Sequence, residues 1–265
     1  MRSFSQDDAH IFCTPEQIGT EIQSLFAMVQ EVYAVFGFED VEVKLSTRPE
    51  KSMGDPELWD KAEAILSDTL TQSGINFQVE AGEGAFYGPK IDYFIRDALN
   101  RRWQLTTIQL DFSLPERFGL TYIDDHSQEQ RPVMIHRALL GSLERFIGVY
   151  LEHTAGDFPL WLAPVQVKVM TVTDQQKDYA LKVSEALKTM GWRVEVDGRN
   201  EKLGYKIREA QVAKVPYALV IGDREMRDQT VSPRRRGGET LKPMSVNDLM
   251  DILKSEVASK QGEIR

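Results

Sequence analysis

Residues 82–112 read GEGAFYGPKIDYFIRDALNRRWQLTTIQLDF, and this stretch decides the fold of the first half of the chain. Three glycines and a proline within Gly82–Lys90 predict a tight, irregular loop with exposed backbone N–H groups. The next segments, Lys90–Asp97 and Trp103–Phe112, have the composition of two antiparallel strands joined by a short turn. The loop has no Walker ending, so it is either a hairpin connection or a close approach to a phosphate-bearing ligand.

The segments around this stretch complete an antiparallel α+β domain. Helices are predicted over Glu16–Phe36, Pro56–Gly74 and Gly141–Thr154, and strands over Val41–Leu45 and Phe77–Glu80. Strands grouped in this way favour an antiparallel sheet rather than repeated βαβ units.

A domain boundary is predicted near Pro159 and Pro164, where two prolines interrupt any helix. Beyond it, strands alternate with helices, which predicts a small α/β domain with a mainly parallel or mixed sheet. The expected domains are therefore 1–158 and 159–265. The expected elements of the second are strands at 165–172, 193–196, 217–221 and 230–236, and helices at 174–190, 202–214 and 246–257.

Composition limits the class of protein. The 265 residues include 32 Lys+Arg and 41 Asp+Glu, and the net charge of −9 is uneven: residues 1–160 carry −13 and residues 161–265 carry +4. One cysteine excludes a disulfide framework and fits a reducing compartment. No apolar run reaches membrane-spanning length and no signal peptide is recognisable, so a cytoplasmic protein is expected.

Several polar residues are candidates for chemistry. Gln6, Asp8 and His10 alternate, so a strand there would place all three on one face, which is either a functional site or the solvated face of an edge strand. His136 follows an apolar run, whereas His126 and His153 lie in polar surroundings and are expected at the surface. Gln104 and Gln109 would face opposite ways on one strand unless a bulge intervenes.

Charged candidates lie elsewhere. Lys90 follows the glycine-rich loop at the start of a predicted strand. Arg145 lies in the first turn of a predicted helix, where the more common role is a solvated ion pair with the adjacent Glu144 and the alternative is contact with a polyphosphate. In the second half, Arg234 belongs to a basic cluster of the kind that binds nucleic acid, although a solubilising edge strand is an equal alternative.

Taken together, these motifs resemble one family. The order of QDDAH (6–10), KLSTRPE (44–50), GEGAFYGPK (82–90), TIQLDF (107–112), HRA (136–138) and GSLERF (141–146) is similar to the later catalytic region of the threonyl-tRNA synthetases, a class II family. Their anticodon-binding domain resembles the second half. The resemblance covers nearly the whole chain.

The resemblance implies a role for each matching residue. His10 and His136 match two of three zinc ligands, Asp8 matches the carboxylate that accepts the threonine hydroxyl, and Arg145 matches the arginine that meets the ATP γ-phosphate. Other matches are Gln6, Tyr87 and Gln109 around the amino acid, Lys90 and Gln104 near the adenylate phosphate and ribose, and Asn200, Arg208, Glu225 and Arg234 at the anticodon.

The implied reaction is ligation of threonine to its tRNA through threonyl-adenylate, with Mg-ATP, threonine and threonine tRNA as partners and zinc as cofactor. The family is homodimeric, but its motif 1 dimer element, most of motif 2 and the third, cysteine zinc ligand have no counterpart in these residues; Cys13 matches a non-ligand position. Thr106 and Pro233 also depart from the family pattern. The chain is therefore expected to begin mid-domain and to be inactive or impaired alone. The alternative is a non-catalytic, synthetase-like RNA-binding or regulatory protein.

Overall fold

The computed structural model describes residues 2–260, which divide into two compact units between His153 and Thr154. Both predicted architectures are confirmed: the first unit is α+β and the second is α/β. The predicted boundary at 158/159 stays a prediction. Within the described residues, no helix is both long enough and apolar enough to cross a membrane.

The first unit is built on one six-stranded sheet with the order β1-β8-β5-β4-β2-β3. All neighbours are antiparallel except β2 and β3. Its strands are β1 (Ala9–Cys13), β2 (Val41–Ser46), β3 (Gln78–Glu80), β4 (Lys90–Arg96), β5 (Arg102–Asp111) and β8 (Val133–Ala138), and a separate hairpin is formed by β6 (Tyr122–Ile123) and β7 (Glu129–Gln130).

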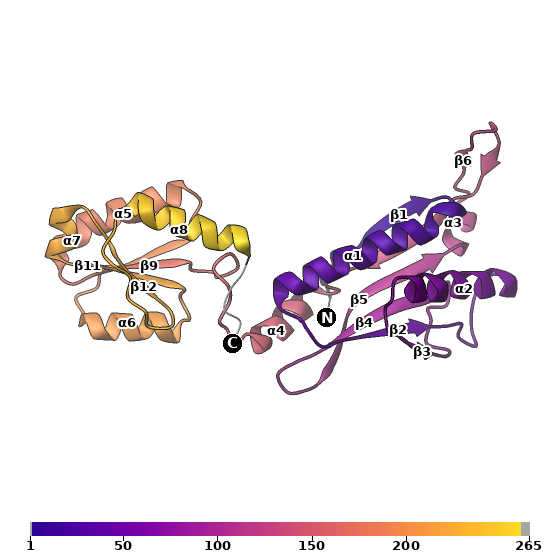
Figure 1. Ribbon diagram of the computed structural model, residues 1–265, viewed down its shortest axis with the longest axis horizontal. Coiled ribbons are helices and arrows are strands. Elements are labelled where there is room, and N and C mark those ends of the chain that lie inside the picture. Colours follow the sequence, from indigo (N-terminus) through magenta and orange to yellow (C-terminus); the bar gives the residue numbers. More distant parts are fainter. Residues whose placement is uncertain (1, 261–265) are drawn as a thin grey trace. The chain divides into compact units, whose positions relative to one another are not determined.

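Helices α1 and α2 pack against each other beside this sheet (Figure 1). Tyr33 of α1 bonds Thr106 of β5, and the neighbouring Ile108 and Leu110 are fully buried. This face of the sheet therefore holds the core and leaves the other face for polar residues. The helices are α1 (Ile18–Phe36, preceded by a 3₁₀ turn at Pro15–Gln17), α2 (Pro56–Gln72), α3 (Ser113–Arg117) and α4 (Leu143–His153).

One surface prediction was wrong. His126 is exposed as expected, but His153 is half-buried and packs 5.1 Å from the ring of Phe38. It follows Tyr150 on the buried side of α4, and these aromatic contacts hold the imidazole away from water.

The second unit is a four-stranded mixed sheet with the order β10-β9-β11-β12, in which β12 is an antiparallel edge strand. Pro233 lies on this edge, where a missing N–H is tolerated. Its elements are β9 (Val167–Thr171), a 3₁₀ turn (Asp174–Gln176), α5 (Lys177–Thr189), β10 (Val194–Asp197), α6 (Leu203–Val212), β11 (Tyr217–Ile221), α7 (Asp223–Asp228), β12 (Ser232–Arg235) and α8 (Val246–Ser259).

The two faces of this second sheet have separate cores. Tyr217 and Leu219 pack with residues of α5 and α8, whereas Met170 and Ala218 pack with Ala210 of α6. Figure 1 shows α6 on the opposite side of the strands from α5 and α8.

Candidate functional site

A single row of polar side chains crosses the first sheet on the face opposite Tyr33. The strand registers place one residue from each of six strands side by side: His10, His136, Gln109, Lys90, Ser46 and Glu80. Residues in register share a face, so the alternation predicted for single strands becomes a continuous polar surface.

The two histidines meet at one end of this row. Their ring centroids are 4.7 Å apart, and His136 Nε2 lies 2.9 Å from the Asp111 carboxylate. His10 Nε2 lies 3.8 Å from Asp8. Asp111 is fully buried and so fixes the orientation of the His136 ring, as carboxylates beside metal-binding histidines commonly do. Among the described residues, no group of three or more acidic, cysteine or histidine ligands is present.

The glycine-rich loop places Tyr87 over the centre of the row. The Tyr87 hydroxyl donates to Gln109 Oε1 at 2.8 Å, and Gln109 Nε2 donates to the Gly88 carbonyl at 3.3 Å. Burial raises the pKa of Tyr87, and the carboxylates of Asp111 and Asp8 raise it further, so the phenol stays protonated as a donor. Only glycine fits at position 88, because a Cβ there would lie 1.9 Å from the Leu110 carbonyl oxygen.

Asp92 organises the other side of the row. This fully buried carboxylate pairs with Lys90 and accepts hydrogen bonds from Gln104 at 2.6 Å and Thr107 at 2.9 Å. The ammonium group of Lys90 is therefore held in place by a carboxylate two residues along the same strand.

The conditional prediction about Gln104 and Gln109 is resolved by a bulge. The β4–β5 register shifts between Asp92 and Phe94, where two β5 residues stand opposite one β4 residue. The bulge brings both glutamines to the same face.

Seven of the nine residues predicted for the first unit line one cavity of about 290 Å³. They are Gln6, Asp8, Tyr87, Gln104, Gln109, His136 and Arg145. Lys90 and His10 are not among the lining residues. Lys90 pairs with Asp92, which bonds the lining residue Gln104, and the ring of His10 contacts that of His136. Arg145 is exposed at the start of α4, beside Gly141, whose φ of +66° turns the chain into that helix.

Sequence reasoning missed three supporting carboxylates. Asp7 accepts the backbone N–H groups of Leu139 and Leu140, and Asp92 and Asp111 hold the side chains described above. For Asp92 and Asp111, the available signal was an acidic residue within or at the end of a strand with many apolar residues, since such a charge requires partners.

In the second unit, the predicted RNA contacts are only partly brought together. Glu225 accepts from Ser232 at 2.7 Å, and Ser232 lies two residues before Arg234 on the same face of β12. Arg208 lines a separate groove beside β10, and Asn200 is exposed in the loop after β10. Within the described part of the chain, the buried Arg234 Nε has no hydrogen-bond partner, so one donor of this side chain is unused.

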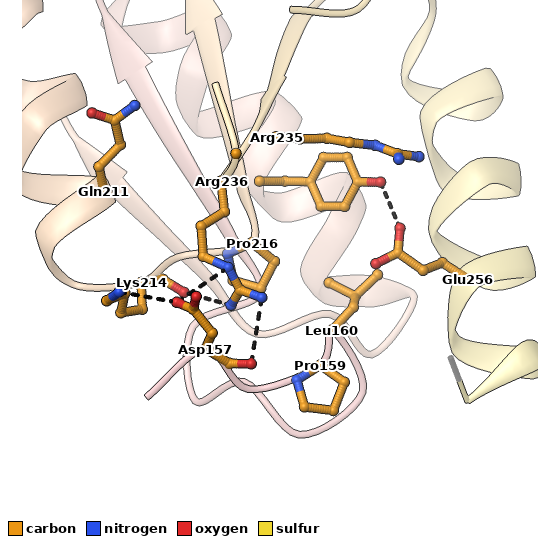
Figure 2. Close-up of a pocket in the computed structure, with 11 residues that line it drawn as sticks. Asp157, Pro159, Leu160, Gln211, Lys214, Pro216, Arg235, Arg236 and Glu256 are labelled. Carbon is orange, nitrogen blue, oxygen red and sulfur yellow. Dashed lines mark hydrogen bonds and ion pairs between the residues drawn. The ribbon is translucent and has the colours of Figure 1, made fainter. Parts of the chain in front are cut away.

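A further cavity of about 230 Å³ in this unit includes none of these four residues. Figure 2 shows Asp157 between Lys214 and Arg236. Arg236 also donates to the carbonyl of Phe158 at 2.9 Å. Because these charges pair with one another, they hold the segment around Asp157 and Phe158 against the rest of the second unit. They are therefore not free to bind a ligand in the cavity.

Comparisons with known proteins agree with the geometry. Residues 1–154 match the family described as the tRNA synthetase class II core domain (G, H, P, S and T), and residues 166–256 match the anticodon binding domain. The chain is 56% identical to a threonine–tRNA ligase of Syntrophotalea carbinolica, over 97% of this chain and 40% of that protein. It is 51% identical to that of Halorhodospira halophila, over 99% of this chain and 41% of that protein. The chain thus spans about two fifths of these relatives.

Solved structures give the same picture. The RNA-binding domain of a threonyl-tRNA synthetase from Cryptosporidium parvum superposes with a TM-score of 0.91 at 42% identity, covering 96% of this chain and 64% of that one. A threonyl-tRNA synthetase described as ThrRS-1, from Aeropyrum pernix, gives a TM-score of 0.79 at 31% identity, covering 99% of this chain and 65% of that one.

Proposed function

The chain belongs to the class II aminoacyl-tRNA synthetases, in the family of the threonine–tRNA ligases, and on this basis we propose that it supplies part of the site that activates threonine with ATP, together with the unit that binds threonine tRNA. The observation that carries the proposal is the convergence of seven expected residues on one cavity. Threonine, Mg-ATP and threonine tRNA are the partners that this function requires.

We propose that the amino acid binds at the end of the polar row where His10 and His136 lie. In this proposal Asp8 accepts the threonine hydroxyl, which is supported by its position in the same cavity lining as the amide and phenol groups of Gln6, Tyr87 and Gln109. A site that hydrogen-bonds a hydroxyl rejects an isostere lacking it, which separates threonine from valine.

His10 and His136 fit two positions of a zinc site. Both are imidazoles in register on adjacent strands, and Asp111 orients the second ring. When bound, zinc would supply Lewis acidity toward the amino and hydroxyl groups of threonine. Two ligands make a weak site, so further donors would be needed for tight binding.

We propose that the cationic side chains of Arg145 and Lys90 bind the phosphates of ATP. Arg145 is exposed at the cavity, and in this proposal it meets the ATP γ-phosphate. Lys90 and Gln104, both bonded to Asp92, are proposed to contact the adenylate. The proposed reaction is in-line attack of the threonine carboxylate on the α-phosphorus, followed by threonyl transfer to the terminal ribose of the tRNA.

Zinc binding tests the histidine assignment directly. Equilibrium dialysis of zinc against the full chain should show His136→Ala binding at least tenfold more weakly than wild type, because a ligand is removed. The matched variant Cys13→Ala should bind zinc as wild type does, since Cys13 is not a proposed ligand. Equal binding by His136→Ala and wild type would refute the assignment.

A further inference from the structure

Lys206 is a fully buried lysine whose ammonium group is held by main-chain oxygens. It lies on the inner face of α6 with 0% exposure. Its Nζ donates to the carbonyl of Thr171 at 2.9 Å and lies 3.3 Å from the carbonyl of Asp197. These are the last residues of β9 and β10, two neighbouring parallel strands, so one cation joins both strand ends.

Core packing alone does not require a lysine at this position. Removing an ammonium group from water is costly, and an apolar side chain of similar length would fill the same space without that cost. Within residues 2–260, Lys206 forms no ion pair within 4 Å, and both of its hydrogen bonds go to backbone carbonyls. Its charge also contributes, after the larger effect of Arg199, to lowering the pKa of the Asp197 carboxyl. The charge of Lys206 therefore stabilises both the backbone and the carboxylate at the end of β10.

The backbone in question is the loop from Gly198 to Lys202. The loop leaves β10 at Asp197, whose carbonyl Lys206 binds, and it re-enters structure at α6, the helix that carries Lys206. Lys202, the residue that caps α6, makes no side-chain hydrogen bond to the first turn. Lys206 thus fixes both ends of a loop whose helix start is otherwise uncapped.

A second tie holds the same loop from outside. Arg199 donates to both oxygens of the Asp197 carboxylate, at 2.9 and 2.6 Å, and also pairs with Glu209 of α6. Asn200, between these ties, stays exposed. A loop end at the carboxyl edge of parallel strands is where α/β sheets commonly present ligand-binding groups.

We infer that Lys206 is a positioning residue for RNA recognition: by joining the ends of β9, β10 and α6 it holds the loop 198–202 so that Asn200 can contact the anticodon. This inference rests on the proposed function of the second unit. Lys206 itself, being buried, touches no RNA.

The positioning claim is tested without RNA. Lys206→Met keeps the length of the side chain and removes its donors, and Lys188→Met, an exposed lysine on α5, is the matched control. In hydrogen–deuterium exchange of the full chain, peptides covering 198–205 should exchange at least threefold faster in Lys206→Met, whereas peptides covering β11 should not change. Unchanged exchange at 198–205 would overturn the inference. If Lys206→Met speeds exchange in β11 as well, it is compared with Lys206→Gln, which keeps donor hydrogens. Exchange at 198–205 should then be slower in Lys206→Gln than in Lys206→Met, and equal exchange in the two variants would overturn the inference.

The consequence for recognition is tested with two tRNA transcripts, threonine tRNA and the same tRNA with an altered anticodon. Lys206→Met should weaken binding of the first about tenfold and of the second less than twofold, and adding Asn200→Ala should cause no further loss. Equal loss on both transcripts, or none, would overturn the role in recognition. If wild type does not distinguish the transcripts, the proposed function fails, while the exchange result still decides the positioning of the loop.

Discussion

At the scale of single residues, Cys13 is a sensitive reporter of the folded first unit. It is buried in β1, and burial, with a smaller contribution from Glu21, raises its pKa to about 11. Because the thiolate is the reactive form, only about one thiol in a thousand is ionised at pH 8. We expect alkylation by iodoacetamide at pH 8 to be about 100-fold slower in the native chain than in urea. Comparable rates in the two conditions would show that the thiol is accessible.

Gly88 is the residue on which the glycine-rich loop depends. The Cβ of Gly88→Ala would overlap the Leu110 carbonyl, which belongs to a central strand that cannot move aside. We expect a loss of about 3 kcal/mol in the free energy of unfolding, measured by urea denaturation.

Gly148 provides the control for this substitution. It lies in α4 with no atom within 4 Å of a built Cβ, so Gly148→Ala should stabilise the chain by about 0.5–1 kcal/mol. Similar effects at the two glycines would show that the close contact at Leu110 does not exist.

At the scale of elements, the hairpin joining β4 and β5 depends on one carboxylate. Burial would raise the pKa of Asp97, but hydrogen bonds from the Trp103 indole, from Arg101 and from the Leu99 amide outweigh it and lower the pKa to about 2. A depressed folded-state pKa stabilises the protein above the unfolded value of 3.8, and this contribution is lost as the pH falls through about 2.

Asp97→Asn tests this dependence. The variant should melt at a lower temperature than wild type at pH 5 to 7, and the difference should shrink between pH 4 and pH 2, as the wild-type carboxylate becomes protonated. Thermal melts followed by circular dichroism at each pH provide the measurement. A difference that stays constant down to pH 2 would mean that the charge of Asp97 does not support the hairpin.

Local patterns predicted most elements because their causes are local. Gly37 ends α1 in a left-handed conformation with φ of 70°, and Pro56 begins α2 after the N-cap Asp55. The sequence could not predict whether β5 contains a bulge, because the bulge depends on partners far away in the chain. The buried Thr106 at the bulge bonds both Tyr33 and the Leu139 carbonyl. The strand β8 was missed for the same reason, because its pairing with β1 and β5 joins segments far apart in the chain.

The histidine pair shows the same limit for the site. His10 and His136 were matched individually by resemblance, but only the register of β1 against β8 places them opposite each other. Asp92 and Asp111 were not singled out in the sequence, although Asp111 lies within TIQLDF, because most of their partners lie on other strands. The types of residue in the site could thus be predicted from sequence, whereas the carboxylates that orient them required the assembled sheet.

At the scale of the whole molecule, the net charge of each half says less about RNA binding than the surface on which individual charged side chains lie. Residues 161–265 carry an excess of only +4. On β12, Arg234 lies opposite Ala218 on the α6 face, while Arg235 lies opposite Tyr217 on the α8 face and over its ring. The two arginines therefore carry equal charge to opposite sides of one sheet.

This pair allows net charge to be separated from placed charge. We expect the full chain to bind threonine tRNA more weakly as salt rises, because bound phosphates release counterions. Arg234→Ala should weaken binding about tenfold at 0.1 M salt and reduce the slope of log affinity against log salt by about one, while Arg235→Ala should leave both nearly unchanged. Filter binding from 0.05 to 0.3 M salt measures both quantities. Equal losses in the two variants would mean that the tRNA responds to overall charge, and the anticodon assignment of Arg234 would then be wrong.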